Sequence, residues 1–336
     1  MSTEASLGSS AEPLDQRYDL AMLDLDGVVY IGPDAVPGAP EHIAVARQAG
    51  MRVAFITNNA ARTPQTVAEQ LRDLGVDADD GDVVTSAQAA ARLLADRLGA
   101  GGRVVVLGAD GLEQAVLEAG LVPVHVEDDA DAVVTGYGPE VRWRHIMRAS
   151  VRIRDGLWWV ASNTDMTIPT AFGVAPGHGV LVETVRRFSG VEPVVAGKPA
   201  RPLLDETVRR CGGERPLMVG DRLDTDIAGA RVAGVDSLLV MTGVTGLPEL
   251  AAATPEERPT YVAADLGGLA GAHPAPQLQD EAVTLAGWTA RVSDGALAVD
   301  GTGERDDWWR VVAVAAWRHL DDAGEPASTD GVEPPE

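Results

Sequence analysis

The sequence contains very little cysteine, because Cys211 is the only one among 336 residues. A single cysteine excludes a disulfide within the chain, and a buried, unreactive thiol is its simplest interpretation. No apolar run approaches the length of a membrane span. The opening segment, MSTEASLGSSAEPLDQ, lacks the basic start and the apolar core of a signal peptide. We therefore expect residues 1–16 to form a disordered leader on a cytoplasmic protein.

Positive charge is also scarce, since 27 Lys and Arg stand against 51 Asp and Glu and leave a net charge of −24. Such a surface repels nucleic acid and anionic lipid, so we expect neither nucleic acid nor a membrane as a partner. A small anionic substrate is still compatible with it. Bulk charge is screened beyond about 8 Å at physiological salt, and a few local cations can then dominate a pocket.

Several common catalytic motifs are missing. The sequence has no P-loop, no G-x-S-x-G and no H-E-x-x-H. The GTG at 301–303 lacks a preceding strand and a following helix of the right form, so we interpret it as a turn. His145, His178 and His319 do not have metal-ligand spacing, and we interpret them as structural. These absences exclude the best-known hydrolase and nucleotide-binding signatures.

What the sequence does contain is a regular alternation of strand and helix patterns. From Asp19 to about Gly81, the apolar runs YDLAMLDL and MRVAFIT alternate with the helical patterns GAPEHIAVARQAG and TPQTVAEQLRDLGV. The same alternation continues through the middle of the chain and returns after it. This pattern predicts an α/β protein with a doubly wound, Rossmann-like parallel-sheet core. An apolar content of 45% over 336 residues is enough for two or three domains.

Polar side chains follow four of the predicted strands. Asp24 and Asp26 follow the first strand, Thr57, Asn58 and Asn59 the second, Lys198 the third, and Asp221 with Asp224 and Asp226 the fourth. In open α/β sheets, ligands bind beyond the carboxyl ends of the strands. Carboxylates suit a Mg²⁺ ion, and a lysine with exposed backbone N–H groups suits a phosphate.

Four short motifs carry these residues: DLDG at 24–27, TNN at 57–59, GKP at 197–199 and GDRLDTDI at 220–227. Each motif alone is weak, since D-x-D is common in an acidic chain. In this order, the set resembles the haloacid dehalogenase superfamily of phosphohydrolases, over roughly residues 17–270. The resemblance implies a Mg²⁺-dependent phosphatase.

The resemblance also implies roles for single residues. Asp24 would attack phosphorus and form an aspartyl-phosphate, and Asp26 would act as general acid and then as general base. Thr57, Asn58 and Lys198 would bind the phosphate, and Lys198 would also keep the nucleophile ionised. The expected metal ligands are Asp24, Asp221 and the backbone carbonyl of Asp26. Asp226 would orient a metal-bound water, and Asp224 would cap a helix.

The intervals between motifs predict where a further domain is inserted. Asp24 and Thr57 are 33 residues apart, which leaves room for one helix and one strand, whereas Thr57 and Lys198 are 141 residues apart. The spacing resembles the subclass with a large α/β cap between the second and third motifs. We expect the following parts: leader 1–16, core 17–82, cap 83–178, core 179–272, a small α+β C-terminal extension 273–322 and a disordered tail 323–336.

Within this subclass the resemblance extends to phosphatases of p-nitrophenyl phosphate, phosphoglycolate, pyridoxal phosphate and glycerol 3-phosphate, and to actinobacterial members with a C-terminal extension. SNTDMTIPT at 162–170 resembles the return from cap to core. The extension itself contains patterns for one hairpin and one helix. Candidate residues for substrate specificity are Asn59, Arg62, Gly136, Tyr137, Asn163, Thr164 and Asp165.

The substrate is left open by the sequence. Glycerol 3-phosphate and 2-phosphoglycolate are favoured, with pyridoxal phosphate, nucleotides and sugar phosphates as alternatives. A mutase or phosphotransferase with a helical cap between the first two motifs does not fit the 33-residue interval. A non-catalytic binding protein on the same fold is the alternative from another class, although Asp24, Asp26, Lys198 and Asp221 are all retained. A homodimer is a further expectation.

Overall fold

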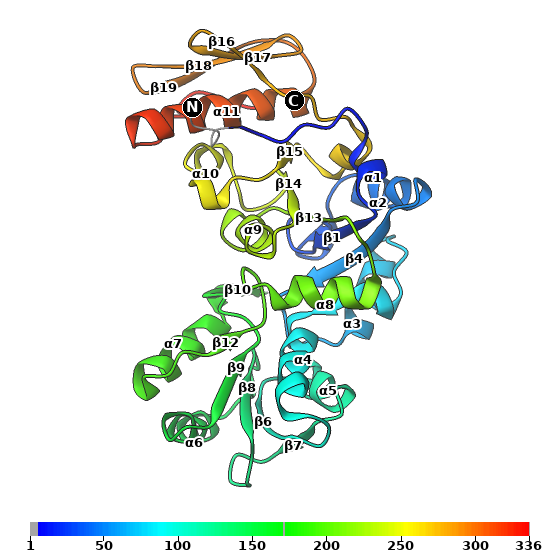
Figure 1. The fold of residues 1–336 in the computed structure, drawn as a ribbon, viewed down its shortest axis with the longest axis vertical. Coiled ribbons are helices and arrows are strands. Elements are labelled where there is room, and N and C mark those ends of the chain that lie inside the picture. Colours follow the sequence, from blue (N-terminus) through cyan, green and yellow to red (C-terminus); the bar gives the residue numbers. More distant parts are fainter. Residues whose placement is uncertain (1–5, 171, 336) are drawn as a thin grey trace. The chain divides into compact units, whose positions relative to one another are not determined.

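The computed structural model describes residues 6–170 and 172–335, which belong to two compact units (Figure 1). Unit 1 comprises residues from 1–53 and 213–336, and unit 2 comprises 54–212. Each unit contains parallel strands joined through helices, which confirms the predicted α/β class. The predicted cap boundaries at 83 and 178 stay a prediction. Each unit is described by itself below.

Unit 1 contains four parallel strands in the order β15, β14, β13 and β1. Their bounds are Leu20–Asp24 (β1), Pro216–Gly220 (β13), Asp236–Val240 (β14) and Tyr261–Ala263 (β15). All five residues of β1 are buried, as expected for a parallel strand covered on both faces. Leu23 lies opposite Val219, so the segments that follow β1 and β13 leave the sheet at the same edge.

Short helices and turns complete this part of unit 1. They are α1 (Leu14–Arg17), α2 (Ala39–Gln48), α9 (Ala228–Ala233), α10 (Leu247–Ala251), the 3-10 turns η3 (Pro255–Glu257) and η4 (Leu266–Ala270), and the small hairpin of β2 (Tyr30–Ile31) and β3 (Asp34–Ala35). Between β13 and α9, residues Leu223–Ile227 form a π-helical turn, η2. Turns of this kind occur frequently at functional sites.

The C-terminal extension of unit 1 is an antiparallel sheet covered by one long helix. The sheet contains β16 (Gln277–Gln279), β17 (Ala282–Leu285), β18 (Trp288–Ser293) and β19 (Ala296–Gly301), and the helix is α11 (Arg305–Ala323). The sequence predicted the helix, but it predicted a hairpin where the structure has four strands. Two strands were therefore missed, and one of them, β16, is exposed at every residue and carries no apolar signal.

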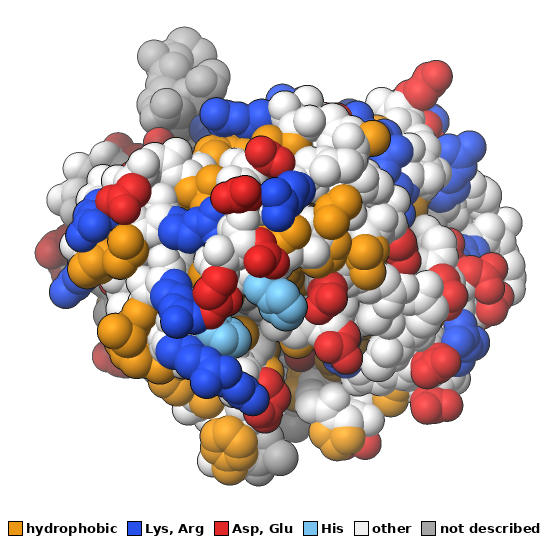
Figure 2. Space-filling model, turned by 90° about the horizontal axis from the view of Figure 1, so that it is seen from below, with side chains coloured by type: hydrophobic (Ala, Val, Ile, Leu, Met, Phe, Trp, Pro, Cys, Tyr) orange, Lys and Arg blue, Asp and Glu red, His pale blue; other side chains and the backbone are white. Residues whose placement is uncertain are grey.

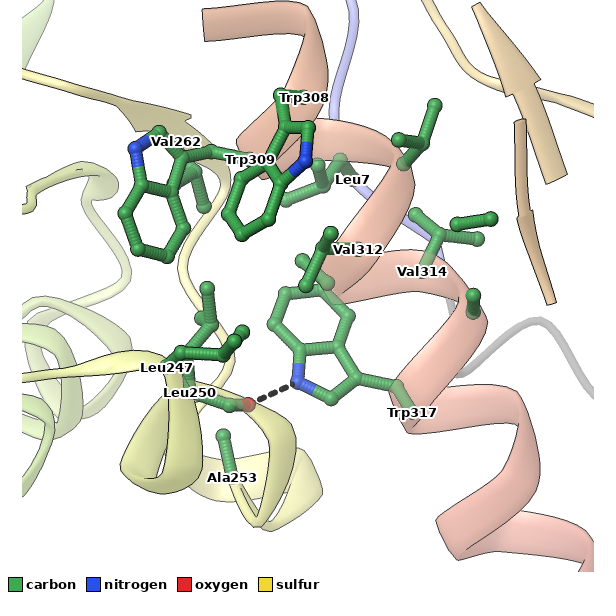
Figure 3. Close-up of a cluster of buried hydrophobic side chains, with 14 of the residues drawn as sticks. Leu7, Leu247, Leu250, Ala253, Val262, Trp308, Trp309, Val312, Val314 and Trp317 are labelled. Carbon is green, nitrogen blue, oxygen red and sulfur yellow. Dashed lines mark hydrogen bonds between the residues drawn. The ribbon is translucent and has the colours of Figure 1, made fainter. Parts of the chain in front are cut away.

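Helix α11 contributes three tryptophans to a buried apolar cluster. Trp308 and Trp309 pack edge to face, with ring centroids 4.8 Å apart. Trp317 lies beside α10, and its indole N–H donates to the carbonyl of Leu250 at 2.7 Å (Figure 3). The cluster also includes Leu7. Core packing is therefore the role of this tryptophan pair.

The two ends of the chain, as far as they are described, differ from the expected disorder. Ser10 forms a backbone bridge with His273, and Leu14 is fully buried. At the other end, Ser328 forms a bridge with Ala296, next to the buried Ala327. Both ends are polar in overall composition, but each contains single apolar residues that pack into the core of unit 1.

Unit 2 contains a parallel sheet of five strands in the order β12, β9, β8, β6 and β7. Its elements are β5 (Val83–Thr85), α4 (Ser86–Leu98), β6 (Arg103–Leu107), α5 (Asp110–Glu118), β7 (Val122–Val124), β8 (Ala132–Thr135), α6 (Trp143–Arg154), β9 (Trp158–Ala161), β10 (Thr167–Thr170), β11 (Gly173–Pro176), α7 (His178–Ser189), β12 (Val194–Val195) and α8 (Pro202–Cys211). Strand β4 (Arg52–Thr57), helix α3 (Pro64–Asp73) and the turn η1 (Asp80–Asp82) precede them. Strand β4 is paired in parallel with β5.

Capping explains where the helices near the motifs begin. Thr63 precedes α3, accepts a hydrogen bond from the N–H of Thr66, and is followed by Pro64 at the first helical position. Thr85 precedes α4, and its hydroxyl and the Gln88 side chain cap each other's backbone N–H groups. The start of α4 is therefore fixed firmly, directly beside the end of β5.

The surface combines charges of both signs. On the face that Figure 2 shows, basic side chains are interspersed with acidic ones. Arg92 with Asp96 and Arg148 with Glu127 are examples of exposed ion pairs. Such pairs contribute little to stability, about 0–1 kcal/mol each. Across the described ranges, no helix has the length and hydropathy needed to cross a membrane.

Candidate active site

Three carboxylates meet at the carboxyl edge of the parallel sheet in unit 1. Asp24 ends β1, Asp221 follows β13, and Asp226 lies in the π-helical turn η2. One oxygen of each carboxylate lies within 4.8 Å of the others, and all three residues are buried. Three like charges this close repel one another unless a cation offsets them. The cluster therefore has the donor atoms and the burial of a site for a hard cation.

The carboxylate of Asp221 is held in place from one side by backbone. The N–H of Val244 donates to its Oδ2 at 2.6 Å. A Cβ atom at Gly27 would lie 2.4 Å from this oxygen, and one at Gly243 would lie 2.0 Å from it. Neither position can therefore carry a side chain without displacing the carboxylate. The glycine of the DLDG motif thus has a packing reason in addition to its positive φ of 84°.

Asp226 is anchored by the backbone on the other side of the cluster. Its Oδ2 accepts hydrogen bonds from the N–H groups of Asp221 at 3.2 Å and Arg222 at 3.1 Å. A Cβ atom at Gly220 would lie 2.2 Å from its side chain. Sequence reasoning placed Asp226 outside the metal ligands, and the structure brings its carboxylate into the same cluster as Asp24. Its role as a ligand or as an orienting group stays a prediction.

Asp26 and Asp224 lie differently from these three. Asp26 is exposed and forms a backbone bridge with Tyr30, closing the turn after β1. Its predicted acid–base role stays a prediction. Asp224 was expected to cap a helix, and this expectation is wrong. Its carboxylate pairs with the guanidinium of Arg222 at 2.8 Å, and no side chain caps η2 or α9.

In unit 2, the side chain of Asn58 holds the backbone of Lys198. Its Oδ1 accepts from the N–H of Lys198 at 2.8 Å, and its Nδ2 donates to the Lys198 carbonyl at 3.0 Å. The same Nδ2 also donates to Asp165 Oδ1 at 3.1 Å. Thr57, at the end of β4, is buried next to this group, and Lys198 is only 2% exposed. The second and third motifs are therefore joined directly.

The carbonyl of Asn58 is a second meeting point. It accepts hydrogen bonds from Ser86 Oγ and from Asn163 Nδ2, each at 2.6 Å. Asn163 Oδ1 in turn accepts from the N–H of Asp165 at 3.1 Å. Sequence reasoning missed Ser86, because it lies between the capping Thr85 and the body of α4 and belongs to none of the motifs. The only available signal was its position at a strand end.

The remaining specificity candidates lie elsewhere in unit 2. Asn59 closes a local turn, since its Oδ1 accepts from the N–H of Ala61 at 2.9 Å. The guanidinium of Arg62 donates to the side chain of Gln70. Tyr137 is half-buried, and the neighbouring Gly136 packs close to Ser162 Oγ. Thr164 accompanies Asn163 in the segment that leaves β9. Their contacts with a substrate stay predictions.

His178 starts α7 and illustrates a buried group with a structural role. Its Nε2 lies 3.2 Å from Thr135 Oγ1, which also accepts from the indole N–H of Trp159 at 3.0 Å. Burial lowers the pKa of His178 to about 4, so the imidazole is neutral at physiological pH. The structural interpretation made from the sequence fits this environment.

Comparison with known proteins identifies the family. The chain matches the sequence model of haloacid dehalogenase-like hydrolases over residues 21–122 and a second, related hydrolase model over 195–269. It is 42% identical to the D-glycerol 3-phosphate phosphatase of Mycobacterium tuberculosis over 312 residues, which cover 90% of this chain and 86% of the relative. The chain belongs to the haloacid dehalogenase-like hydrolases.

Other members of this family share part or all of the chain. An acid sugar phosphatase of Staphylococcus aureus is 34% identical, over 75% of this chain and 96% of its own length. A crystal structure of glycerol phosphate phosphatase from M. tuberculosis in complex with magnesium superimposes with a TM-score of 0.83 at 40% identity, covering 94% of each chain. A 4-nitrophenylphosphatase from Thermotoga maritima gives 0.71 at 32% identity, over 76% of this chain and 98% of its own.

These relatives confirm two predictions made from the sequence. The family is the one that the four motifs indicated, and the enzyme class is a phosphatase acting on a small phosphorylated compound. The carboxylate cluster of unit 1 fits the predicted Mg²⁺, because all three side chains offer the oxygen atoms that this ion prefers. The S. aureus and T. maritima proteins are matched over only about three quarters of the chain.

Proposed function

We propose that this protein is a Mg²⁺-dependent phosphatase that hydrolyses glycerol 3-phosphate or a similarly small phosphomonoester through an aspartyl-phosphate. The observation that carries the proposal is the buried cluster of Asp24, Asp221 and Asp226 at the strand ends of unit 1. Buried carboxylates without a cation are costly, so a cluster of this kind is poorly explained as structure alone.

The metal would be held by the side chains of Asp24 and Asp221 and by the backbone carbonyl of Asp26, with Asp226 beside them. When bound, Mg²⁺ supplies positive charge that stabilises the transferring phosphoryl group. The chain itself contributes the rigidity of the site. Asp221 and Asp226 each accept backbone hydrogen bonds, so their carboxylates are oriented before the ion arrives.

Asp24 acts as the nucleophile in this proposal. One of its carboxylate oxygens attacks phosphorus, and the bond between phosphorus and the leaving oxygen breaks while Asp26 donates a proton to that oxygen. Asp26, now ionised, takes a proton from water. The resulting hydroxide attacks the aspartyl-phosphate, releases inorganic phosphate and regenerates the Asp24 carboxylate. Each residue therefore ends the cycle in the state in which it began.

Lys198 and Thr57 hold the phosphoryl group during these steps. The ammonium of Lys198 neutralises charge that develops on the non-bridging oxygens, and the Thr57 hydroxyl donates to one of them. Lys198 is 2% exposed and Thr57 is 4% exposed, so both act in a site with little water. Electrostatic interactions are stronger there than in bulk solvent.

Glycerol 3-phosphate is favoured over the other substrates by the pattern of similarity. The M. tuberculosis relative matches 90% of this chain at 42% identity. The S. aureus acid sugar phosphatase matches 75% of the chain at 34% identity. 2-Phosphoglycolate, pyridoxal phosphate, nucleotides and sugar phosphates are the alternatives. A cytoplasmic location and a homodimer stay predictions.

A phosphate-release assay tests the proposal. The purified protein is incubated with Mg²⁺ and each candidate phosphomonoester, together with p-nitrophenyl phosphate, and inorganic phosphate is measured. We expect the largest kcat/KM for glycerol 3-phosphate, complete loss of release with EDTA, and recovery when Mg²⁺ is added in excess. No release from any of the compounds would favour the non-catalytic binding protein instead.

A further inference from the structure

We propose that Ser86 and Asn163 are positioning residues that set the place of the catalytic lysine by acting through Asn58. The inference deepens the proposed function and rests on the role of Lys198 in it. It changes three assignments made from the sequence. Asn58 was expected to bind phosphate, and Asn163 and Asp165 were expected to contact substrate. In this proposal, the side chains of all three serve the backbone around Lys198.

The side chain of Asn58 contacts the backbone of Lys198 directly. The Asn58 amide makes a two-point contact, because it accepts from the Lys198 N–H at 2.8 Å and donates to the Lys198 carbonyl at 3.0 Å. A two-point contact fixes orientation as well as distance. The preceding Gly197 leaves room for it, since a Cβ atom there would lie 2.5 Å from Asn58 Oδ1. The origin of the long lysine side chain is thereby fixed.

Asn58 is itself held by two hydrogen-bond donors. Its carbonyl has two lone pairs, and Ser86 Oγ and Asn163 Nδ2 each donate to it at 2.6 Å. Ser86 is fully buried and Asn163 is 3% exposed. Removing either donor would leave the carbonyl with one hydrogen bond in a dry environment, where a lost bond is not replaced by bulk water.

Hydrogen bonds among Asn58, Asp165 and Asn163 close a ring. Asn58 Nδ2 donates to Asp165 Oδ1 at 3.1 Å, and the Asp165 N–H donates to Asn163 Oδ1 at 3.1 Å. Asn163 then donates back to the carbonyl of Asn58. Both polar atoms of the Asn58 amide are thus engaged by protein groups. A closed ring of this kind has one preferred arrangement, and we infer that it selects one backbone position for Lys198.

The residues that bind Asn58 come from segments that are far apart in the chain. Ser86 begins α4 after strand β5, Asn163 and Asp165 follow β9, and Lys198 follows β12. The predicted cap begins and ends close to two of these segments. A displacement of either segment would therefore be felt at Lys198, and small displacements near reacting groups can lower a rate by about 100-fold.

The first experiment measures kcat and KM for p-nitrophenyl phosphate in Asn58→Ala and Ser86→Ala. We expect kcat to fall about 100-fold and about 10-fold respectively, with KM changed less than about 3-fold, because the lysine acts mainly on the transition state. Ser150→Ala is the matched control. Ser150 is also buried, and its Oγ donates to the carbonyl of Ile146 at 2.7 Å, so it should keep the wild-type kcat.

The second experiment is a double-mutant cycle with Lys198→Met. If Asn58 acts through the lysine, Asn58→Ala and Ser86→Ala will lower kcat only slightly in the Lys198→Met background, where the ammonium is already missing. Because Lys198→Met will turn over slowly, the cycle is also measured by calorimetry as the Kd for orthovanadate in Mg²⁺. This measurement of vanadate binding does not depend on turnover. Thermal melting verifies that each variant is folded. If Asn58→Ala is not folded, the cycle is measured with Ser86→Ala alone.

The inference would be overturned if Asn58→Ala and Ser86→Ala lowered kcat and vanadate affinity by equal factors in the wild type and in Lys198→Met. A purely structural role or a direct phosphate contact predicts such additive effects. A KM increase with unchanged kcat in Asn58→Ala would also overturn it and restore the phosphate-binding role. These outcomes are distinct from failure of the proposed function. In that case the wild-type protein itself releases no phosphate, while the vanadate cycle still reports whether Asn58 acts through Lys198.

Discussion

At the scale of single residues, the carboxylate of Asp24 is the group whose replacement is most informative. Asp24→Asn keeps the shape of the side chain but removes the attacking charge. We expect phosphate release to fall by at least about 1,000-fold. The melting temperature without Mg²⁺ should stay the same or rise, because one of three clustered like charges is gone. Unchanged release in this variant would contradict the covalent mechanism.

His273 predicts how stability depends on pH. It is 1% exposed, its Nε2–H donates to the Gly268 carbonyl at 2.8 Å, and its Nδ1 lies 3.0 Å from the Arg310 guanidinium. Burial, and then the positive charge of Arg310, lower its pKa from 6.5 to about 4. His273 therefore binds a proton near pH 6.5 in the unfolded chain, but only near pH 4 in the folded protein.

The stability that this histidine contributes is complete above about pH 6.5 and is lost as the pH falls toward 4. Between pH 7.5 and 5 we expect the free energy of unfolding to decrease by about 2 kcal/mol from this group. Urea titrations at several pH values measure the slope. His273→Gln, which does not titrate, should flatten the profile in this window, and an unchanged profile would refute the assignment.

At this scale, the sequence indicated the chemically obvious residues and missed the ones that hold them. Asp24, Asp221 and Lys198 were singled out because each lies in a short motif at a strand end, and the structure brings the first two into one cluster. Their catalytic roles stay predictions. Ser86 could not be singled out, because its importance comes from reaching the carbonyl of Asn58, and no local pattern marks that contact. Hydrogen bonds to backbone carbonyls depend on tertiary structure rather than on residue type.

At the scale of elements, the loops of unit 1 that contain Gly27 and Gly243 pack against the carboxylate of Asp221. This close packing requires glycine at position 243. A Cβ atom at Gly243 would lie 2.0 Å from Asp221 Oδ2, so Gly243→Ala must move either the loop or the carboxylate. We expect the Mg²⁺ concentration for half-maximal activity to rise about 10-fold or more. A Mg²⁺ titration of phosphate release measures it.

The control for this change is Gly81→Ala. A Cβ atom at Gly81 meets no heavy atom within 4 Å, and the backbone there does not adopt a positive φ. This variant should bind Mg²⁺ as the wild type does. If both alanine variants needed the same Mg²⁺ concentration for half-maximal activity, the close packing of Gly243 would have no role in placing Asp221.

Elements with a strong apolar period were predicted well, and polar ones were not. Strand β1 and helix α11 were evident, because both bury apolar residues in long runs. Strand β16 was missed, since its three residues are all exposed. Asp224 was expected to cap a helix, whereas it lies within the π-turn η2, and the extra residue of a π-turn leaves no signature in composition.

At the scale of the whole molecule, α11 joins the C-terminal extension to the rest of unit 1. Trp317 is fully buried and donates to the Leu250 carbonyl of α10. Trp317→Ala removes a large side chain and leaves a cavity, so we expect the free energy of unfolding to fall by about 3–5 kcal/mol. Urea denaturation measures this value. Trp317→Phe should lose less, and equal losses would show that packing is not the cause.

The N-terminal strap, residues 6–16, has a consequence for how the extension is completed. Leu7 enters the cluster of α11, the Gly8 N–H donates to the Thr260 carbonyl, and Ser10 exchanges backbone hydrogen bonds with His273. The apolar interior of the extension is thus assembled from segments that lie far apart in the sequence, since Leu7 and α11 both contribute to it. Both segments have to be in place before that interior can close, and a protease clipping the strap would reopen it.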